Sequence, residues 1–182
     1  RTLASGGADA FYKGEIAEKI SGDVQANGGL LEVSDFAQYT PFLHRHGILG
    51  EYRGYEVMGL PGPTSGPTVM ETLNILSTFE LNGTDHGDPA VLHLIVEAIK
   101  LAASDRFTWM GDPEITGAPI GALTVPAYGA ERAKSIDRAK AGPAYAGNPW
   151  PYEGREKPDD FPGPAGAAAD DGTTHISVVD KD

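Results

Sequence analysis

A long stretch rich in proline and glycine divides this chain and limits what can form on either side of it. It runs from Gly142 to Gly172 and contains Pro162-Gly163-Pro164, followed shortly by three consecutive alanines. Proline interrupts helices and central strands, so we expect no regular element here. A structureless stretch of this length in a compact domain is either functional or mobile. We therefore predict three parts: a mainly helical part over residues 1–141, a mobile segment over 142–172 and a strand over 173–182.

Residues 1–141 carry the periodicity of helices. Apolar residues recur every four positions from Ile16 to Val24, which predicts a helix over about residues 14–26. Asp88 suits an N-cap and Pro89 the first helical position of a second helix reaching residue 107. Apolar side chains surround this second helix, so we expect it to be buried.

The remaining elements of this part are expected to be shorter. They are a turn over 34–39 capped by Ser34-Asp35, strands over 48–52 and 55–59 joined at Arg53-Gly54, a helix over 68–79, and a helix over 127–141 with Arg132, Lys134, Arg138 and Lys140 pointing outward. Helix exceeds strand throughout, so the fold class is a helix-rich α+β.

The charge balance excludes several classes of partner. Fourteen Lys and Arg residues stand against 26 Asp and Glu residues, which gives a net charge of −12. Nucleic acids and anionic membrane surfaces need clustered cations, so we expect neither as a partner. The chain has no cysteine, which excludes disulfides and thiolate metal ligands. No apolar run is long enough to span a bilayer.

The junction between Gly172 and Thr173 has the residues that a self-processing hydrolase needs. The Thr hydroxyl can attack the preceding carbonyl, and Gly leaves room for the approach because it has no side chain. After cleavage the free α-amino group of the Thr can act as base for its own hydroxyl. Thr-Thr before alternating residues is also how an ordinary half-buried strand begins, and chemistry alone does not separate the two interpretations.

Several motifs, in one order along the chain, make it resemble the γ-glutamyltransferase family of N-terminal-nucleophile hydrolases. The segment from Thr173 to Asp180 resembles the start of the family's small subunit. The large-subunit resemblance lies in Asp9-Ala10-Phe11-Tyr12-Lys13-Gly14, Gly28-Gly29-Leu30-Leu31, Tyr52-Arg53-Gly54-Tyr55, Leu60-Pro61-Gly62-Pro63-Thr64-Ser65-Gly66, His93 with Glu97 and Lys100, Asp105-Arg106, and Gly111-Asp112-Pro113. It covers nearly the whole chain apart from the proline-rich stretch.

The resemblance implies a fold, a reaction and a nucleophile. The fold is a four-layer αββα sandwich, of which residues 1–172 are the end of the large subunit and 173–182 the first strand of the small one. Self-cleavage between Gly172 and Thr173 frees Thr173 as the catalytic nucleophile, which takes a γ-glutamyl group from an amide such as glutathione and passes it to water or an amine. The resemblance implies no metal or organic cofactor, and family members often face outward from the cytoplasm, in the periplasm or outside the cell.

Three alternatives accompany this interpretation. Relatives with the same self-cleaving core act as glutaryl or cephalosporin acylases or on poly-γ-glutamate, and a non-catalytic homologue could serve as an interaction module. The family's carboxylate-binding Arg, second Thr and Gly-Gly oxyanion hole have no matching positions here, so we expect this chain alone to be inactive and to depend on the remainder of both subunits.

Other polar residues have weaker claims to a site. His175 would share a strand face with Thr173, where it supports the site or serves a structural role. His44-Arg45-His46 suits a solvated loop better than a metal pair, and Pro61 to Gly66 a shaped turn better than an anion loop. His93 with Glu97 predicts a packing contact. Asp105-Arg106 predicts a local ion pair or a helix C-terminal anchor.

Overall fold

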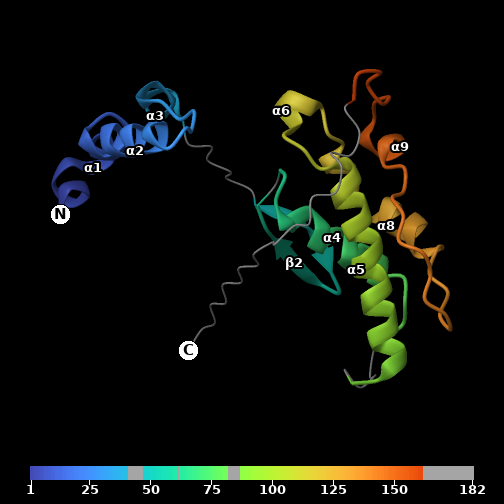
Figure 1. Cartoon of the computed structure of the whole chain (residues 1–182). Helices are drawn as coiled ribbons and strands as arrows, with labels where there is room; N and C mark the ends of the chain where they lie inside the picture. The colour runs from blue at the N-terminus through green and yellow to red at the C-terminus, as the bar shows by residue number, and fades with distance from the viewer. Residues whose placement is uncertain (41–46, 61, 82–86, 162–182) are drawn as a thin grey trace. The chain divides into compact units, whose positions relative to one another are not determined.

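The computed structural model describes residues 1–40, 47–60, 62–81 and 87–161 of the chain (Figure 1). The fold divides into two compact units, Arg1–Arg45 and His46–Asp182. The described part is helix-rich with one two-stranded sheet, as expected for the α+β class.

The first unit holds three helices, α1 (Thr2–Tyr12), α2 (Glu15–Ala26) and α3 (Val33–Gln38). The predicted helix over 14–26 is confirmed by α2. Aromatic side chains join α1 to the region of α3: the rings of Phe11 and Phe36 meet edge to face at 5.9 Å, and those of Tyr12 and Tyr39 stack at 5.8 Å.

The start of α3 differs from the expectation. Glu32 is the N-cap, and its backbone N–H donates to the Asp35 carboxylate at 2.8 Å. The two side chains form a capping box, in which cap and third helical residue satisfy each other's backbone N–H groups. The prediction of Ser34-Asp35 as the cap is therefore wrong, because Asp35 closes the box from inside the helix.

The second unit begins with the predicted hairpin. Strands β1 (Ile48–Tyr52) and β2 (Tyr55–Met58) pair antiparallel, with Tyr52 opposite Tyr55. The turn residues Arg53 and Gly54 both have positive φ, 52° and 84°. This is the conformation that a two-residue turn needs to match the twist of its strands. Both strands are confirmed.

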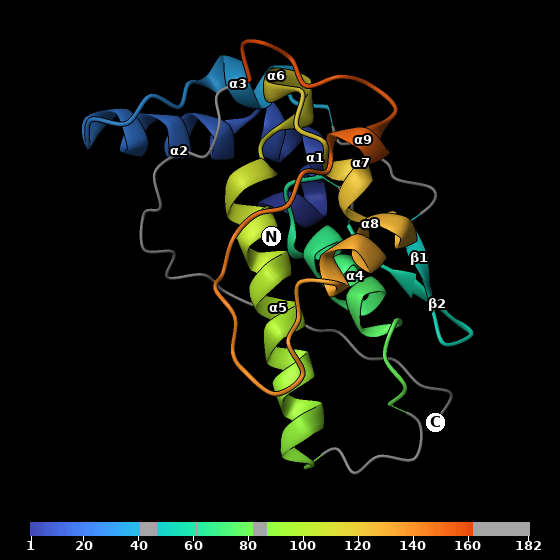
Figure 2. The same ribbon diagram turned by 90° about the vertical axis from the view of Figure 1, so that its right-hand side faces the viewer.

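Three helices form the core of the second unit: α4 (Ser65–Leu76), α5 (Pro89–Trp109) and α8 (Pro126–Ala133) (Figure 2). The buried apolar cluster comprises Ile75, Leu76, Phe79, Leu94, Ala98, Leu101 and Ala133. At the α4–α8 contact, a Cβ added at Gly129 would lie 2.4 Å from Cβ of Asn74. Glycine is thus required for this close approach. Three short helices complete the unit: α6 (Pro113–Thr116), α7 (Ile120–Leu123) and α9 (Trp150–Glu153).

Helices α4 and α5 each depart from prediction in one respect. Helix α4 starts at Ser65, three residues earlier than expected, because the Thr64 side chain caps it by accepting from the Gly66 N–H at 3.2 Å. Helix α5 starts at Pro89 as predicted, capped by Asp88. It is not buried on every side, since its face with Leu92, Val96 and Ile99 is about half exposed.

Helix α8 ends at Ala133, so the predicted extension to residue 141 is wrong. The Asp137 side chain accepts from the Ala139 N–H at 2.8 Å, a local bond that competes with helical pairing. The Asp137 carbonyl accepts from His93 Nε2 at 2.8 Å. The expectation of no regular element over 142–172 is wrong at α9, where proline occupies the first turn, the one place in a helix that tolerates it.

Candidate functional site

The residues predicted to carry the chemistry, Gly172, Thr173 and His175, lie outside the described residues. So does the His44-Arg45-His46 motif. Within the described ranges, no three His, Asp or Glu side chains are grouped so that they could hold a metal ion. No helix in that part of the chain is long and apolar enough to cross a membrane.

The most elaborate polar arrangement in the described residues surrounds Asp105, on the last turns of α5. Its carboxylate is fully buried and accepts three hydrogen bonds. Oδ2 accepts from the Tyr128 hydroxyl and from Arg132 Nε, both at 2.8 Å, and Oδ1 accepts from the Gly147 N–H at 2.6 Å. Tyr128 and Arg132 are four residues apart on α8, which places both on one helix face. The ion pair with Arg132 compensates the cost of burying the charge.

Glu71 adds a fourth buried polar group to this cluster, from α4. Burial, together with the neighbouring Asp105 carboxylate, raises the pKa of Glu71 to about 10, against the opposing effect of Arg132. Glu71 is therefore a neutral acid at pH 7. Burial, and then the Asp105 charge, also raise the pKa of Tyr128, which stays a phenol and a hydrogen-bond donor.

This cluster contradicts two expectations from the sequence. Arg132 was expected to point outward but is 3% exposed, because Asp105 lies beneath it. Of the two alternatives for Asp105-Arg106, the local ion pair is wrong. Arg106 donates instead to the Thr64 carbonyl at 2.9 Å, from the last turn of α5 to the start of α4, which agrees with the helix C-terminal anchor. The spacing of Tyr128 and Arg132 is the one sequence signal that could have indicated a shared polar face.

The cluster also binds the chain that follows α8, residues 142–161, which we call the strap. The strap runs alongside α5 in Figure 2. Arg132 Nη2 donates to the Tyr145 carbonyl, and Trp109 Nε1 donates to the Gly147 carbonyl at 3.0 Å. The His93–Glu97 prediction of a packing contact takes a different form: Glu97 accepts from the Gly142 N–H at 3.1 Å, while His93 binds Asp137.

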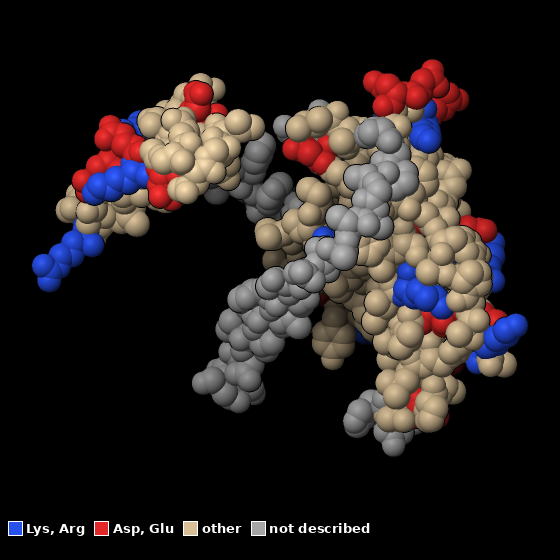
Figure 3. Space-filling model, viewed as in Figure 1, with Lys and Arg blue, Asp and Glu red and all other residues tan. Residues whose placement is uncertain are grey.

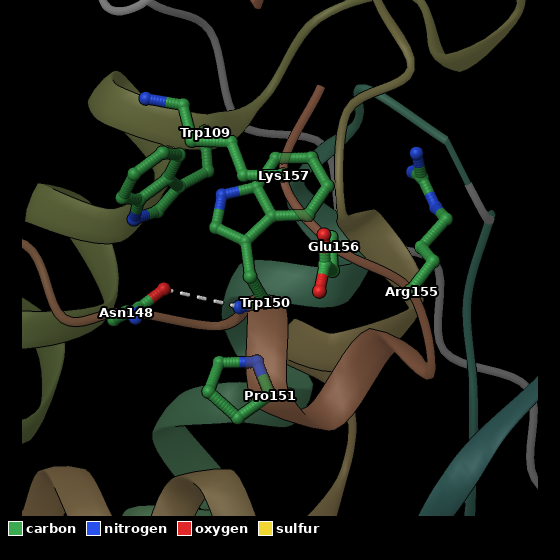
Figure 4. A pocket seen from close by; sticks show the side chains of 7 residues that line it. All are labelled: Trp109, Asn148, Trp150, Pro151, Arg155, Glu156 and Lys157. Atoms are coloured by element: carbon green, nitrogen blue, oxygen red, sulfur yellow. Dashed lines mark hydrogen bonds between the residues drawn. The ribbon is translucent and has the colours of Figure 1, made fainter. Parts of the chain in front are cut away.

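A pocket of about 530 Å³ opens between the strap and the end of α5 (Figure 4). The rings of Trp109 and Trp150 meet edge to face, with centroids 6.3 Å apart, and Arg155 lies over Trp150 at 5.1 Å. The lining consists of Trp109, Asn148, Trp150, Pro151, Arg155, Glu156 and Lys157. None of these residues is a Ser, Thr, Cys or His. Its aromatic contacts pack the strap against α5.

The surface shown in Figure 3 has mixed charge. Lys and Arg side chains of the described residues lie among Asp and Glu side chains and uncharged surface on this face.

Known proteins are similar to this chain over nearly its whole length. The family model for gamma-glutamyltranspeptidase matches residues 1–182. The chain belongs to this family. It is 39% identical to the glutathione hydrolase proenzyme of Escherichia coli (strain K12), over 99% of this chain and 29% of that protein. The resemblance expected from the motifs is confirmed.

Two solved structures share the fold of the described part. The gamma-glutamyltranspeptidase of Helicobacter pylori superposes with a TM-score of 0.68 at 29% identity, covering 79% of this chain and 41% of that one. The cephalosporin acylase of Bacillus halodurans superposes with a TM-score of 0.71 at 32% identity, covering 82% and 27%. The chain thus spans less than half the length of each relative, within the N-terminal-nucleophile hydrolase superfamily.

Proposed function

We propose that this chain is part of a self-processing γ-glutamyltransferase cut between Gly172 and Thr173. Residues 1–172 would end the large subunit, and residues 173–182 would begin the small one as the first strand of a four-layer αββα sandwich. The observation that carries the proposal is the family match, which runs through residue 182 and so includes the Gly172-Thr173 junction. The Escherichia coli relative is a glutathione hydrolase proenzyme, and this supports processing.

The proposed processing step exchanges an amide for an ester and then hydrolyses it. The Thr173 hydroxyl oxygen bonds to the Gly172 carbonyl carbon, the amide C–N bond breaks, and the nitrogen takes up the proton that the hydroxyl loses and becomes the Thr173 amine. Water then cleaves the ester, which restores the hydroxyl and leaves a carboxylate on Gly172. The freed amine can act as base, since its reference pKa is about 7.7–8.0.

The mature Thr173 would repeat this attack on substrate. Its hydroxyl attacks the γ-carbonyl of a glutamyl amide, the amine leaves with a proton, and a γ-glutamyl ester on Thr173 remains. Water or a second amine accepts the acyl group and regenerates the enzyme. His175, on the same face of the proposed strand, would support this site or the strand itself. Turnover would need the remaining parts of both subunits.

A second substrate class follows from the acylase relative. The cephalosporin acylase superposes as well as the transpeptidase does, which supports keeping a glutaryl or cephalosporin acylase as the alternative. A glutaryl group lacks the α-amine of a γ-glutamyl group. Parallel assays with γ-glutamyl and glutaryl anilides therefore separate the two classes by their kcat/KM ratio, and we expect the γ-glutamyl substrate to be preferred.

The deciding experiment is denaturing mass spectrometry of the full-length protein, with Thr173→Ala and Thr174→Ala as a matched pair. We expect two polypeptides from the natural protein, one of which begins at Thr173. Thr173→Ala should give one uncut polypeptide and no turnover, while Thr174→Ala should still be cut. Two polypeptides from Thr173→Ala would overturn the nucleophile assignment. One uncut polypeptide from the natural protein would favour the interaction-module alternative.

A further inference from the structure

The strap is attached to the helical core along its whole described length, which bears on what happens after the proposed cleavage. We propose that residues 142–161 stay attached to α5, α7 and α8 when the Gly172–Thr173 bond is cut, and that the strap acts as a fixed anchor for the new carboxyl end. This inference rests on the proposed self-cleavage. It differs from the expectation of a mobile segment over 142–172.

The first attachment is at Gly142, where the backbone is held on both sides. Its N–H donates to Glu97 at 3.1 Å, and its carbonyl accepts from Lys100 Nζ at 2.7 Å. Glu97 and Lys100 form an ion pair on α5, and the Glu97 side chain is 4% exposed. Hydrogen bonds to charged groups are about twice as strong as neutral ones, so this end of the strap is firmly held.

The second attachment is at Gly147, which is fixed by the buried cluster. The Asp105 carboxylate accepts from its N–H at 2.6 Å, and Trp109 donates to its carbonyl. If the strap detached, the fully buried Asp105 carboxylate would lose the hydrogen bond that it accepts from the Gly147 N–H. A buried polar group that loses a hydrogen-bond partner destabilises the fold, and the loss is larger when the group is charged.

The third attachment covers α9 and the residues after it. Glu153 accepts from the Ala122 N–H on α7 at 2.7 Å, and Arg155 donates to the Gly117 carbonyl. Trp150 is 5% exposed, and the ring of Phe161 lies 5.8 Å from that of Trp109 on α5. The described attachments therefore reach the last described residue.

A fixed Phe161 limits the reach of the cut end. Gly172 is eleven residues beyond Phe161 (172 minus 161), and an extended chain spans at most about 3.6 Å per residue. The new carboxyl end can therefore travel no further than about 40 Å from the anchor.

Trypsin gives a direct test, because the strap has one usable site. Arg155 and Lys157 are the only basic residues between 142 and 172, and Lys157 precedes Pro158, which blocks trypsin. The measurement is the rate of cutting after Arg155 in the full-length protein, relative to a synthetic peptide of residues 150–161. We expect cutting at least about 100-fold slower than in the peptide, since it requires local unfolding. The protection should be equal in processed protein and in uncut Thr173→Ala.

A matched pair of glycine substitutions tests the attachment itself. A Cβ at Gly147 would lie 2.5 Å from the Tyr128 hydroxyl and 2.6 Å from Arg132 Cδ, so Gly147→Ala should displace the strap from the packed core. A Cβ at Gly142 would meet Glu97 at 3.5 Å, an ordinary contact. We expect Gly147→Ala to raise the cutting rate at least about 10-fold and Gly142→Ala to change it less than about 2-fold.

The outcomes separate this inference from the proposed function. If processed protein is cut after Arg155 as fast as the peptide while Thr173→Ala is protected, the strap is released by cleavage and the inference is wrong. Cutting as fast as the peptide in both forms also overturns it. If the natural protein is not processed, the proposed function fails, and protection of Arg155 still reports whether the strap is attached.

Discussion

Replacing Glu71 with Gln should stabilise the protein, and increasingly so as the pH rises. The Glu71 carboxyl is fully buried on α4, and neither of its oxygens has a hydrogen-bonding partner of good geometry among the described residues. Burial and the adjacent Asp105 raise its pKa from 4.5 to about 10. Gln has nearly the same shape and does not ionise.

The sign and size of the effect follow from proton linkage. Between pH 4.5 and about 10, Glu71 keeps its proton in the folded protein and loses it on unfolding, so the unfolded state binds fewer protons and stability falls as pH rises. Each pH unit above 4.5 costs about 1.4 kcal/mol, which gives a cost of about 3 kcal/mol at pH 7. Glu71→Gln removes this cost and should gain up to about 3 kcal/mol at pH 7.

Thermal unfolding of the full-length protein at pH values from about 5 to about 9 measures the effect. The difference in Tm between Glu71→Gln and the natural protein should be small near pH 5 and widen steadily upward. Glu131→Gln is the control: it removes only an exposed ion pair with Lys134, worth at most about 1 kcal/mol. A Glu71→Gln difference that does not change with pH, or a loss of stability throughout, would refute a neutral buried Glu71.

Two further substitutions test the packing around the cluster. Arg132→Met leaves Asp105 buried without its cation and should lower the free energy of unfolding by about 3–5 kcal/mol in chemical denaturation. Lys134→Met, at the exposed C-cap of α8, should lower it by less than about 1 kcal/mol. Gly129→Ala places a Cβ 2.4 Å from that of Asn74. It should lower the free energy of unfolding by about 1–3 kcal/mol, measured by thermal unfolding. An unchanged Tm would contradict the close contact between α4 and α8.

The elements that the sequence predicts best are those with local signals. Asp88 and Pro89 begin α5 because cap and first-turn preferences depend only on neighbouring backbone. The hairpin at Arg53-Gly54 follows from alternation and a turn glycine. The end of α8 could not be predicted, because Ala133 is followed by polar residues that suit a helix as well as a loop. The prediction that α5 is buried on all sides was based on its apolar composition alone. Composition does not show which face of a helix packs against a neighbour.

The buried cluster could not be predicted, because its members come from four separate segments. No local sequence motif indicates burial at any of its members, which are Glu71, Asp105, Arg132 and Gly147. Asp105 selects Arg132 on α8 over the adjacent Arg106 because consecutive residues on a helix point in different directions. The Gly172-Thr173 junction, by contrast, can be recognised from the sequence, because the Gly-Thr pair and the family motifs around it are local signals.

The cluster has features that elsewhere mark an active site, yet its hydrogen bonds indicate a structural role. Perturbed carboxyl and phenol pKa values gather at catalytic centres, but also in buried ion-pair networks. Here all three hydrogen bonds accepted by Asp105 come from within the fold, one of them from the strap backbone at Gly147, and the carboxylate is closed to solvent. Asp105→Asn should therefore lose activity together with stability. Thr173→Ala should lose activity while its Tm is retained, and this difference separates the residue that holds the chain from the residue proposed to do the chemistry.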